Sequence, residues 1–476
     1  MKSSTLCRTW RLSLCLGLAL SLAGCGTLDQ LGLGAISHWF ASTPTKSNLK
    51  GTRIPVLTEA NELRPDPKLK SVPVVLPAPY VNHDWPEAGG YATNAMYHLM
   101  AAGPLRVVWR HDAGKGSDSE SRLTAPPIVT GGRIFVLDAA NHVYAFNATT
   151  GVRLWKRSVA PRGEQSFLNE VSFGLIGSDS RVDPTKGYGG GLGSDDGRIF
   201  VSTGFGDVLA LDPASGKTLW RTHIGVPFMN APVANGGRVF VSSVDNRLHV
   251  LNEKNGHELW EQEGITEHAS ILKASSVAVA NEYVIVPYTS GELFAVRVTN
   301  GHVAWSDTLT KLHSITALGE IDDIAAEPVV DRDMVFAISH SGLMAAIKLS
   351  TGERVWTRDI TGIYTPWVAG HVIYVMTTRN QLLCLERKTG KVKWIHTFSR
   401  WEDPENHEGP IVWAGPVLVS NRLLVTSSDG HAESISPYSG RVLGRISIPD
   451  GEIISPIVAN QMVYLYTRGA ELVALR

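Results

Sequence analysis

A glycine followed four residues later by a tryptophan recurs along most of this chain, and the repeat limits the folds that the chain can adopt. The six complete pairs are Gly151/Trp155, Gly216/Trp220, Gly256/Trp260, Gly301/Trp305, Gly352/Trp356 and Gly390/Trp394. A seventh copy has Gly440, with Gly444 in the tryptophan position, and successive glycines lie 65, 40, 45, 51, 38 and 50 residues apart. A period of about 40–45 residues with four short strands per unit is typical of a β-propeller.

One repeat shows how the strands follow one another. Its four strands are predicted at residues 231–235, 238–243, 247–252 and 257–262. The intervening turns are Gly236-Gly237, Asp245-Asn246 and Asn255-Gly256, and the second has the composition of a hairpin turn. Alternating apolar residues such as Val239 and Val241 fit the two-residue period of a strand.

Counting the repeats predicts eight blades. Seven complete units cover residues 123–158, 191–224, 231–263, 274–309, 325–360, 365–398 and 413–447. The chain then ends with three strands, at 453–458, 462–466 and 471–475. Residues 105–109, LRVVW, carry the tryptophan of an outer strand and precede the first unit. We expect this strand to complete the last blade, which closes an all-β ring of four-stranded antiparallel blades and removes both free edges.

The first 24 residues predict a lipoprotein signal peptide. A basic stretch precedes the apolar run 12–24, which is long enough for a secretory signal and too short to span a bilayer. The run ends in Leu22-Ala23-Gly24-Cys25, which resembles a bacterial lipobox. The resemblance implies cleavage before Cys25 and lipidation of its thiol. The alternative is an ordinary secretory signal that contains a cysteine by chance.

The predicted domains follow from these features. Residues 25–82 are expected to be the lipidated N-terminus and a flexible, proline-rich tether, and residues 83–476 the propeller. Acyl chains without a spanning helix predict a membrane anchor. Gly26, where an inner-membrane retention signal would have Asp, favours the outer membrane. An insertion near 161–188 is either a solvated excursion or a lid or contact loop.

Composition and motifs exclude several functions. Lys and Arg number 44 against 45 Asp and Glu, so the chain lacks the basic footprint of a nucleic-acid-binding protein. Of the four cysteines only Cys384 lies beyond residue 25, which excludes an internal disulfide or cysteine zinc site in the body. The glycine-rich run 187–193 precedes no helix that could bind phosphate, and His407-Glu408 lacks the second histidine of a zinc protease. We therefore predict no catalytic, metal or cofactor residues, and assign the six repeat tryptophans to packing between blades.

The run Ala210–Trp220, ALDPASGKTLW, closely resembles the tryptophan-docking motif of quinoprotein-type propellers. Together with the lipobox and the eight predicted blades, it makes residues 83–476 similar to the BamB family, cofactor-free lipoproteins of the machinery that assembles β-barrels into the bacterial outer membrane. The quinoprotein dehydrogenases are the enzymatic alternative. That family generally has a catalytic Asp, a calcium site and often a vicinal cysteine pair, and one body cysteine excludes such a pair.

Two connections between blades are candidates for partner binding. Residues 268–273, HASILK, contain Ile271 and Leu272 where a loop should be polar, followed by Lys273. Residues 319–327, GEIDDIAAE, contain Asp322 and Asp323. Adjacent apolar and charged loops predict an interaction patch. The alternative is that Ile271 and Leu272 begin a core strand and that the acids are solvated.

The resemblance implies that these loops contact the POTRA domains of BamA, the barrel-bearing partner. The family's first loop has leucines followed by Arg, where this chain has Lys273; its second loop has two acids one residue apart, where Ala325 takes the second place and Asp322 is the substitute. The implied function is a non-catalytic periplasmic scaffold, lipid-anchored to the outer membrane. It would bind BamA and other subunits of the assembly complex and help to deliver unfolded precursors. The alternatives are a quinoprotein-like dehydrogenase and a generic envelope interaction propeller.

Overall fold

Short strands joined by tight glycine and asparagine turns build the protein. Its structure is a computed structural model, which describes residues 63–118, 121–161, 187, 189–265, 275–310, 323–448, 451 and 454–476. All described residues belong to one compact unit, Glu62–Arg476. Asparagine occupies the left-handed position of many turns, as at Asn246 (φ 60°) and Asn460 (φ 51°), which its short polar side chain tolerates better than most. Within the described part of the chain, no helix has the length and apolarity needed to cross a bilayer.

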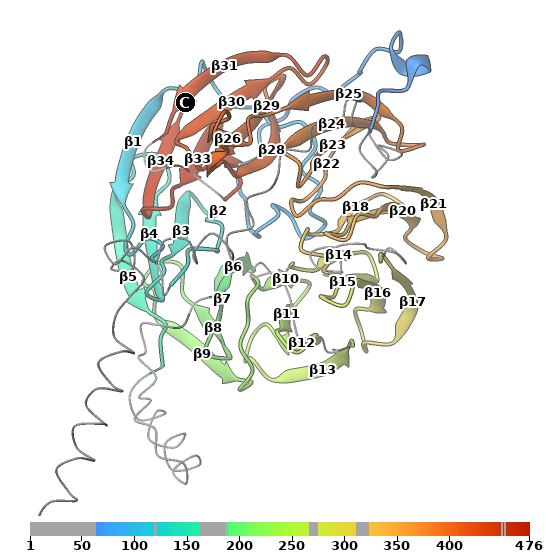
Figure 1. Cartoon of the computed structure of the whole chain (residues 1–476). Coiled ribbons are helices and arrows are strands. Elements are labelled where there is room, and N and C mark those ends of the chain that lie inside the picture. The colour runs from blue at the N-terminus through green and yellow to red at the C-terminus, as the bar shows by residue number, and fades with distance from the viewer. Residues whose placement is uncertain are drawn as a thin grey trace, which may run out of the picture. The chain divides into compact units, whose positions relative to one another are not determined.

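The strands form eight four-stranded antiparallel blades around a ring (Figure 1). Blade 1 consists of β2 (Ile128–Thr130), β3 (Arg133–Leu137), β4 (His142–Asn147) and β5 (Arg153–Ser158). Blade 2 consists of β6 (Gly190–Asp195), β7 (Arg198–Thr203), β8 (Asp207–Leu211) and β9 (Thr218–His223). Blade 3 consists of β10 (Val233–Asn235), β11 (Arg238–Ser243), β12 (Arg247–Asn252) and β13 (Glu258–Glu263). Blade 4 consists of β14 (Ala278–Ala280), β15 (Tyr283–Pro287), β16 (Glu292–Arg297) and β17 (Val303–Thr308).

Blade 5 consists of β18 (Val329–Asp331), β19 (Met334–Ile338), β20 (Met344–Lys348) and β21 (Arg354–Arg358). Blade 6 consists of β22 (Trp367–Ala369), β23 (Val372–Met376), β24 (Gln381–Glu386) and β25 (Val392–Thr397). Blade 7 consists of β28 (Trp413–Val419), β29 (Arg422–Ser427), β30 (His431–Ile435) and β31 (Val442–Ser447). Blade 8 combines β32 (Ile457–Ala459), β33 (Met462–Tyr466) and β34 (Glu471–Leu475) with β1 (Val107–Asp112).

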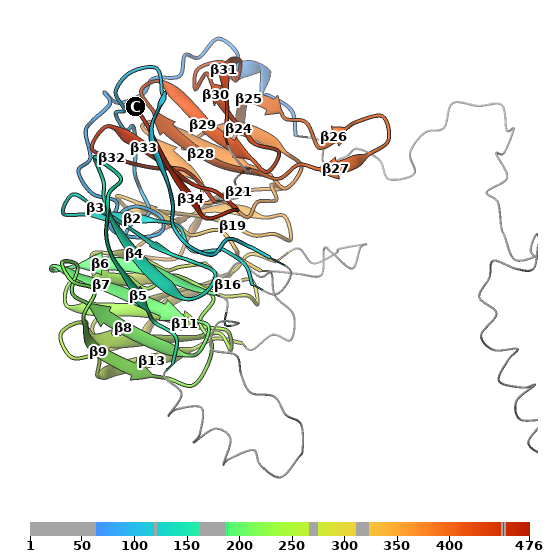
Figure 2. The same ribbon diagram turned by 90° about the vertical axis from the view of Figure 1, so that its left-hand side faces the viewer.

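The ring closes as the sequence predicts. β1 pairs antiparallel with β34, from Val107 opposite Leu475 to Asp112 opposite Glu471. The last blade therefore takes three strands from the end of the chain and its outer strand from the beginning (Figure 1). This confirms the eight-bladed all-β fold. Two segments differ from expectation. A hairpin of β26 (Trp401–Asp403) and β27 (Glu408–Pro410), which we did not predict, lies between blades 6 and 7 and projects from the ring (Figure 2).

The second difference concerns the predicted tether, which reaches residue 82 in our domain assignment. The compact unit begins at Glu62, and residues after it contact blade 6. The Asp66 carboxylate lies 2.8 Å from Lys391 Nζ, and Lys393 Nζ donates to the Val72 carbonyl. Asp66 also caps a short 3-10 helix, η3 (Pro67–Leu69). The boundary therefore moves from residue 82 to residue 62. The sequence shows no strand period here because the segment docks through isolated contacts and not through a ladder.

The repeat tryptophans lie between blades. Each indole N–H donates to a carbonyl oxygen of the following blade; the pairs are Trp109–Thr149, Trp155–Pro213, Trp220–Glu253, Trp260–Val298, Trp305–Leu349, Trp356–Arg387 and Trp394–Pro437. The rings also cover the repeat glycines of that next blade. A Cβ atom on Gly301 would lie 2.5 Å from Trp260 Cε3, and the φ of Gly301 is +72°. Glycine is therefore required there both for space and for backbone conformation.

The junction between blades 7 and 8 lacks this contact. Gly444 of β31 stands where the other outer strands have tryptophan, and Leu105 (φ 60°), four residues before Trp109, stands where the others have glycine. Leu105 is only 4% exposed. At this junction the residue in the tryptophan position is small and the residue in the glycine position is large, and the junction borders blade 8, in which the two ends of the chain pair.

Candidate functional site

The two faces of the ring carry different loops. Connections from an outer strand to the next inner strand share a face with the turns between second and third strands; we call this the connector face. In blade 3, Gly264 N–H donates to the Asn246 carbonyl, and Phe228 forms a bridge with Ser243, which ties connections on both sides of that blade to its second turn. The opposite face, here the hairpin face, carries the turns between first and second strands.

An N-terminal segment closes the hairpin face. Residues 82–102, which we call the clasp, run around the ring and bond in order to every blade. The contacts are Asn82–Asn460, Trp85–Val129, Pro86–Ser194, Glu87–Ala234, Ala92–Val279, Thr93–Val330, Tyr97–Trp367, Leu99–Leu418 and Ala102–Gln461. Because the clasp starts and ends at blade 8, it completes one turn around the inner strands. The hairpin side of the ring centre is therefore occupied by the chain itself.

A central cavity of about 300 Å³ is bounded on one side by the clasp. Trp85, Ala88, Gly89 and Asn94 of the clasp contribute to its lining. Its walls come from the first residues of the inner strands and the connections that precede them. The cavity therefore belongs to the connector-face half of the ring.

The cavity wall is divided into two arcs. Asn230, Ser276, Glu327 and Thr365 come from the consecutive blades 3 to 6 and form a polar arc. Tyr364, Trp367, Val417 and Ile457 come from blades 6 to 8 and form an apolar arc. Trp85 stacks on Trp367 with a ring separation of 6.4 Å. Burial raises the pKa of the Tyr364 phenol, so this hydroxyl stays neutral.

Two side chains of the polar arc have defined partners. Thr365 Oγ1 donates to Glu327 Oε2 over 2.8 Å, and Asn230 Nδ2 donates to the Ser275 carbonyl over 3.1 Å. The other amide atom, Asn230 Oδ1, is buried and accepts no hydrogen bond. The polar arc thus contains one carboxylate, that of Glu327, and one amide, that of Asn230, whose oxygen is buried.

Glu87 of the clasp is a second buried acid, and it lies outside the cavity lining. Its side chain is 1% exposed; Oε1 accepts from Ala234 N–H over 2.9 Å, and Oε2 has no partner. Burial, reinforced by Asp195, Glu253 and Glu327, raises the pKa of the Glu87 carboxyl well above its usual value, although the Ala234 hydrogen bond opposes the shift. Glu87 thus fixes the clasp to blade 3 in a form that favours the bound proton.

The described lining does not fit the calcium and quinone site of a dehydrogenase. Calcium takes about six to eight oxygen ligands. Among the described lining residues Glu327 is the one carboxylate, and neither Lys nor Arg is present to pair with an anionic cofactor. The described lining therefore offers no set of residues that would hold either group.

The predicted partner-binding residues lie at the edge of the described structure. Ile271, Leu272, Lys273 and Asp322 lie outside the described residues, as do Cys25 and most of the insertion at 161–188. Asp323 is described and is 1% exposed, and its carbonyl accepts from His340 N–H in the second turn of blade 5. Ala325 is also buried. The partner-binding role of Ile271, Leu272, Lys273, Asp322 and Asp323 remains a prediction. Because Asp323 is buried, it is unsuitable for a test by charge reversal.

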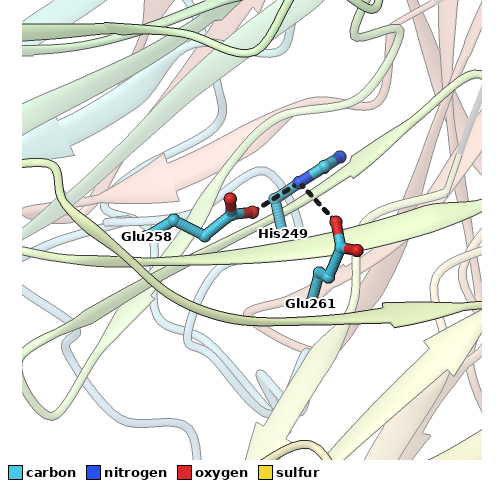
Figure 3. Close-up of side chains that lie close together, drawn as sticks. All are labelled: His249, Glu258 and Glu261. Carbon is cyan, nitrogen blue, oxygen red and sulfur yellow. Dashed lines mark hydrogen bonds and ion pairs between the residues drawn. The ribbon is translucent and has the colours of Figure 1, made fainter.

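One cluster of possible metal ligands occurs among the described residues, on the outer hairpin of blade 3 (Figure 3). His249 Nδ1 lies 2.7 Å from Glu258 Oε1 and 4.0 Å from Glu261 Oε2. Arg247 Nη1 contacts the other oxygen of Glu261 at 2.9 Å, and His249 Nε2 lies 3.3 Å from Ser243 Oγ. These contacts already satisfy the side chains, so the cluster is accounted for as an ionic network.

The sequence analysis did not identify the clasp or this ionic network. The clasp has no periodic pattern, because single residues bond to successive blades. The network could not be predicted from the strand bounds either: a regular pairing of strands 247–252 and 257–262 places His249 opposite Trp260, and the observed pairing with Glu261 depends on a register shift between Val250 and Leu251.

Comparisons of the sequence with known proteins identify one family. A sequence profile described as "Outer membrane protein assembly factor BamB" matches residues 98–179 and 178–396. The protein of that name from Nitrosomonas eutropha is 24% identical over 358 residues, which are 75% of this chain and 78% of the relative.

Solved structures agree on the fold. BamB from Moraxella catarrhalis superposes with a TM-score of 0.62 at 16% identity, covering 78% of this chain and 100% of that one. Quinohemoprotein alcohol dehydrogenase from Comamonas testosteroni superposes with a TM-score of 0.60 at 12% identity, covering 82% of this chain and 80% of that one. Identities this low show the shared fold alone, so the architecture does not by itself separate a scaffold from an enzyme.

Proposed function

The chain belongs to the family of the outer membrane protein assembly factor BamB, and from that membership we propose that it is a non-catalytic scaffold that binds BamA at its POTRA domains. It is anchored to the outer membrane through a lipidated Cys25, faces the periplasm and works with the other subunits of the assembly complex. There it helps to deliver unfolded barrel precursors for insertion.

The observation that carries this proposal is the difference between the two faces. The clasp occupies the hairpin side of the ring centre at all eight blades. The connector face has no such cover from the clasp. It also bears the longest links between blades, including those from β13 to β14 and from β17 to β18. A partner therefore meets the ring at the connector face.

The two candidate loops are neighbours on that face. Residues 268–273 belong to the link between blades 3 and 4, and residues 319–327 to the link between blades 4 and 5. In the proposed interface, Ile271 and Leu272 would supply apolar contact area, and Lys273 and Asp322 would supply opposite charges. An apolar centre with a charged rim is the arrangement in which a few residues provide most of the binding energy.

Charge reversal tests the assignment. We expect the double substitution Lys273→Glu/Asp322→Lys to weaken binding to the purified POTRA domains by at least about tenfold, because a reversed charge meets a like charge on the partner and like-charge contacts across an interface cost several kcal/mol. The measurement is a titration by surface-immobilised binding at moderate salt. Asp323 is left intact because it is buried.

A matched variant carries the same charge changes on the other face. Lys388→Glu/Asp333→Lys alters exposed residues in turns of the hairpin face and should leave the affinity unchanged. If the connector-face variant binds as tightly as the unsubstituted protein, or if both variants lose binding equally, the site assignment is wrong. If the unsubstituted protein does not bind POTRA domains at all, the chain is a propeller with a different envelope partner.

A further inference from the structure

The charge of the hairpin face is uneven, and we propose that its basic part, over blades 6 to 8, binds the anionic headgroups of a phospholipid bilayer. We call this part the basic sector. The inference goes beyond the proposed function, because it concerns the face opposite the candidate loops and does not require BamA. The basic sector consists of residues 63–80 and the hairpin-face turns at 101–106, 369–372, 386–391, 419–422, 436–441 and 459–462.

The first component of the basic sector is the segment 63–80, which lies across blade 6 beside β25 (Figure 1). At the rim, the Asp66 carboxylate lies 2.8 Å from Lys391 Nζ. Nearer the ring centre, a Cβ on Gly370 would lie 3.1 Å from the Val75 carbonyl oxygen. The segment therefore runs from the outer strand of blade 6 to the turn beside its inner strand. It adds three exposed bases to this blade: Arg64, Lys68 and Lys70.

The turns of blades 7 and 8 continue this surface. Tyr438 Oη donates to Asn421 Oδ1 over 2.6 Å, which joins the two hairpin-face turns of blade 7. Arg422 Nη2 donates over 3.3 Å to the carbonyl of Gly103, which precedes the outer strand of blade 8. Blades 6, 7 and 8 thus present their turns as one connected surface.

This surface carries an excess of positive charge. The basic sector contains nine Lys and Arg residues and two acids, and seven of the nine bases are exposed. The corresponding turns of blades 2 to 5 contain seven bases and eight acids. The net charge of the whole chain is −1, so the excess belongs to this sector and not to the protein in general. The bases are Arg64, Lys68, Lys70, Arg106, Arg387, Lys388, Lys391, Arg422 and Arg441, and the acids are Asp66 and Glu386.

Exposed apolar side chains lie among these bases. Val72 and Val75 are 46% and 60% exposed, whereas Val74 and Leu76 of the same segment pack against the core. Tyr438 is 47% exposed. An acidic protein would be complementary to the bases alone. The headgroup region of a bilayer also accepts apolar and tyrosine side chains, so the combination favours a lipid surface.

The course of the chain gives this surface a role. The predicted lipidation site, Cys25, precedes the compact unit, which begins at Glu62 and enters the ring at the basic sector. Acyl chains hold a protein at a bilayer but do not determine which of its faces turns toward it. The basic sector would turn the hairpin face toward the bilayer and the connector face away from it. This consequence rests on the lipid anchor of the proposed function, whereas the binding itself does not.

The test is co-sedimentation of the mature chain, residues 25–476, with lipid vesicles. The substitution Cys25→Ser removes the lipidated thiol, so that acyl chains do not contribute. We expect binding to phosphatidylethanolamine vesicles with about one quarter phosphatidylglycerol at about 0.1 M salt, and at least about tenfold weaker binding to phosphatidylcholine vesicles. Raising the salt to about 0.5 M should release the protein, because salt screens exposed charges.

Three variants locate the binding surface. Lys70→Glu/Lys388→Glu should lower the partition coefficient at least about tenfold, since each base near an anionic surface contributes about a fivefold factor. The matched variant Lys217→Glu/Lys254→Glu makes the same charge change at exposed hairpin-face turns of blades 2 and 3, and should bind within about twofold of the parent. Val72→Ser/Val75→Ser should lower the partition coefficient about threefold or more, because serine inserts less favourably.

Thermal unfolding followed by circular dichroism verifies that each variant folds. The comparisons of lipids and of salt need no substitution in the sector, so they test the proposal even if a variant does not fold. Absence of binding to the anionic vesicles, binding that salt does not weaken, equal loss in both lysine variants, or no effect of the valine substitutions overturns the proposal. Binding of poly-glutamate without binding of vesicles also overturns it and assigns the sector to an acidic protein. BamA is absent from these measurements, so their failure is distinguishable from failure of the proposed function.

Discussion

At the scale of single residues, buried polar groups show where this ring is specialised. Glu87 is buried with one oxygen unpartnered, yet it holds the clasp against Ala234 of blade 3. A Cβ on Gly193 would lie 2.5 Å from Glu87 Oε2, so the neighbouring strand β6 must have glycine for the carboxyl group to fit. The acid therefore occupies a space shaped for it, at some expense in stability.

The effect of Glu87 on the free energy of unfolding depends on pH. The pKa of Glu87 is raised in the folded state, so the folded protein binds its proton more tightly than the unfolded chain does. The stabilising effect of that proton is present below the unfolded pKa and is lost as pH rises toward the folded pKa. We expect Glu87→Gln to raise the free energy of unfolding at about pH 8 by roughly 1–3 kcal/mol, because the amide removes the buried charge. At about pH 4 the two proteins should unfold alike.

Thermal or urea unfolding followed by circular dichroism at both pH values measures this difference. A Glu87→Gln protein that is less stable than the unsubstituted one at the higher pH would show that the carboxylate is needed in its charged form.

At the scale of elements, the repeating contact between blades explains how much the sequence could predict. The Gly-x-x-x-Trp period fixes the number of blades, the strand order and the closure by β1, because each tryptophan must cover a glycine in the next blade. The clasp could not be predicted, since its bonds join residues that share no period. The cavity of the candidate site could not be predicted either. Its lining residues come from every blade, and such a set is apparent only once the ring is closed.

The interblade tryptophans give a test at this scale. Trp305 is 9% exposed and donates through Nε1 to the Leu349 carbonyl. We expect Trp305→Ala to lower the free energy of unfolding by about 3–5 kcal/mol, as for other buried tryptophans that are cut to alanine. Trp305→Phe keeps the ring but loses the indole donor, and should cost about 1–2 kcal/mol.

Chemical denaturation measures both variants. Comparing the two variants separates the contribution of ring packing to stability from that of the hydrogen bond. A Phe variant as unstable as the Ala variant would mean that the hydrogen bond, and not ring packing on Gly352, holds blades 4 and 5 together.

At the scale of the whole molecule, the two ends of the chain determine which face is available. β1 closes the ring at its edge, and the clasp that precedes β1 closes the hairpin side of its centre. The same N-terminal region thus completes the fold and covers the hairpin side of the ring centre, whereas the connector face lacks this cover. Membership of the BamB family and this one-sided architecture together lead to the scaffold proposed above.

Site-specific photo-cross-linking in the native host tests that account most directly. A photoreactive amino acid is placed at Val244, which is 45% exposed in a connector-face turn, or at Asn281, exposed in a hairpin-face turn. The account predicts a cross-link to BamA from position 244 and none from position 281. Cross-linking to BamA from position 281 alone, or from neither position in cells where both proteins are present, would contradict it.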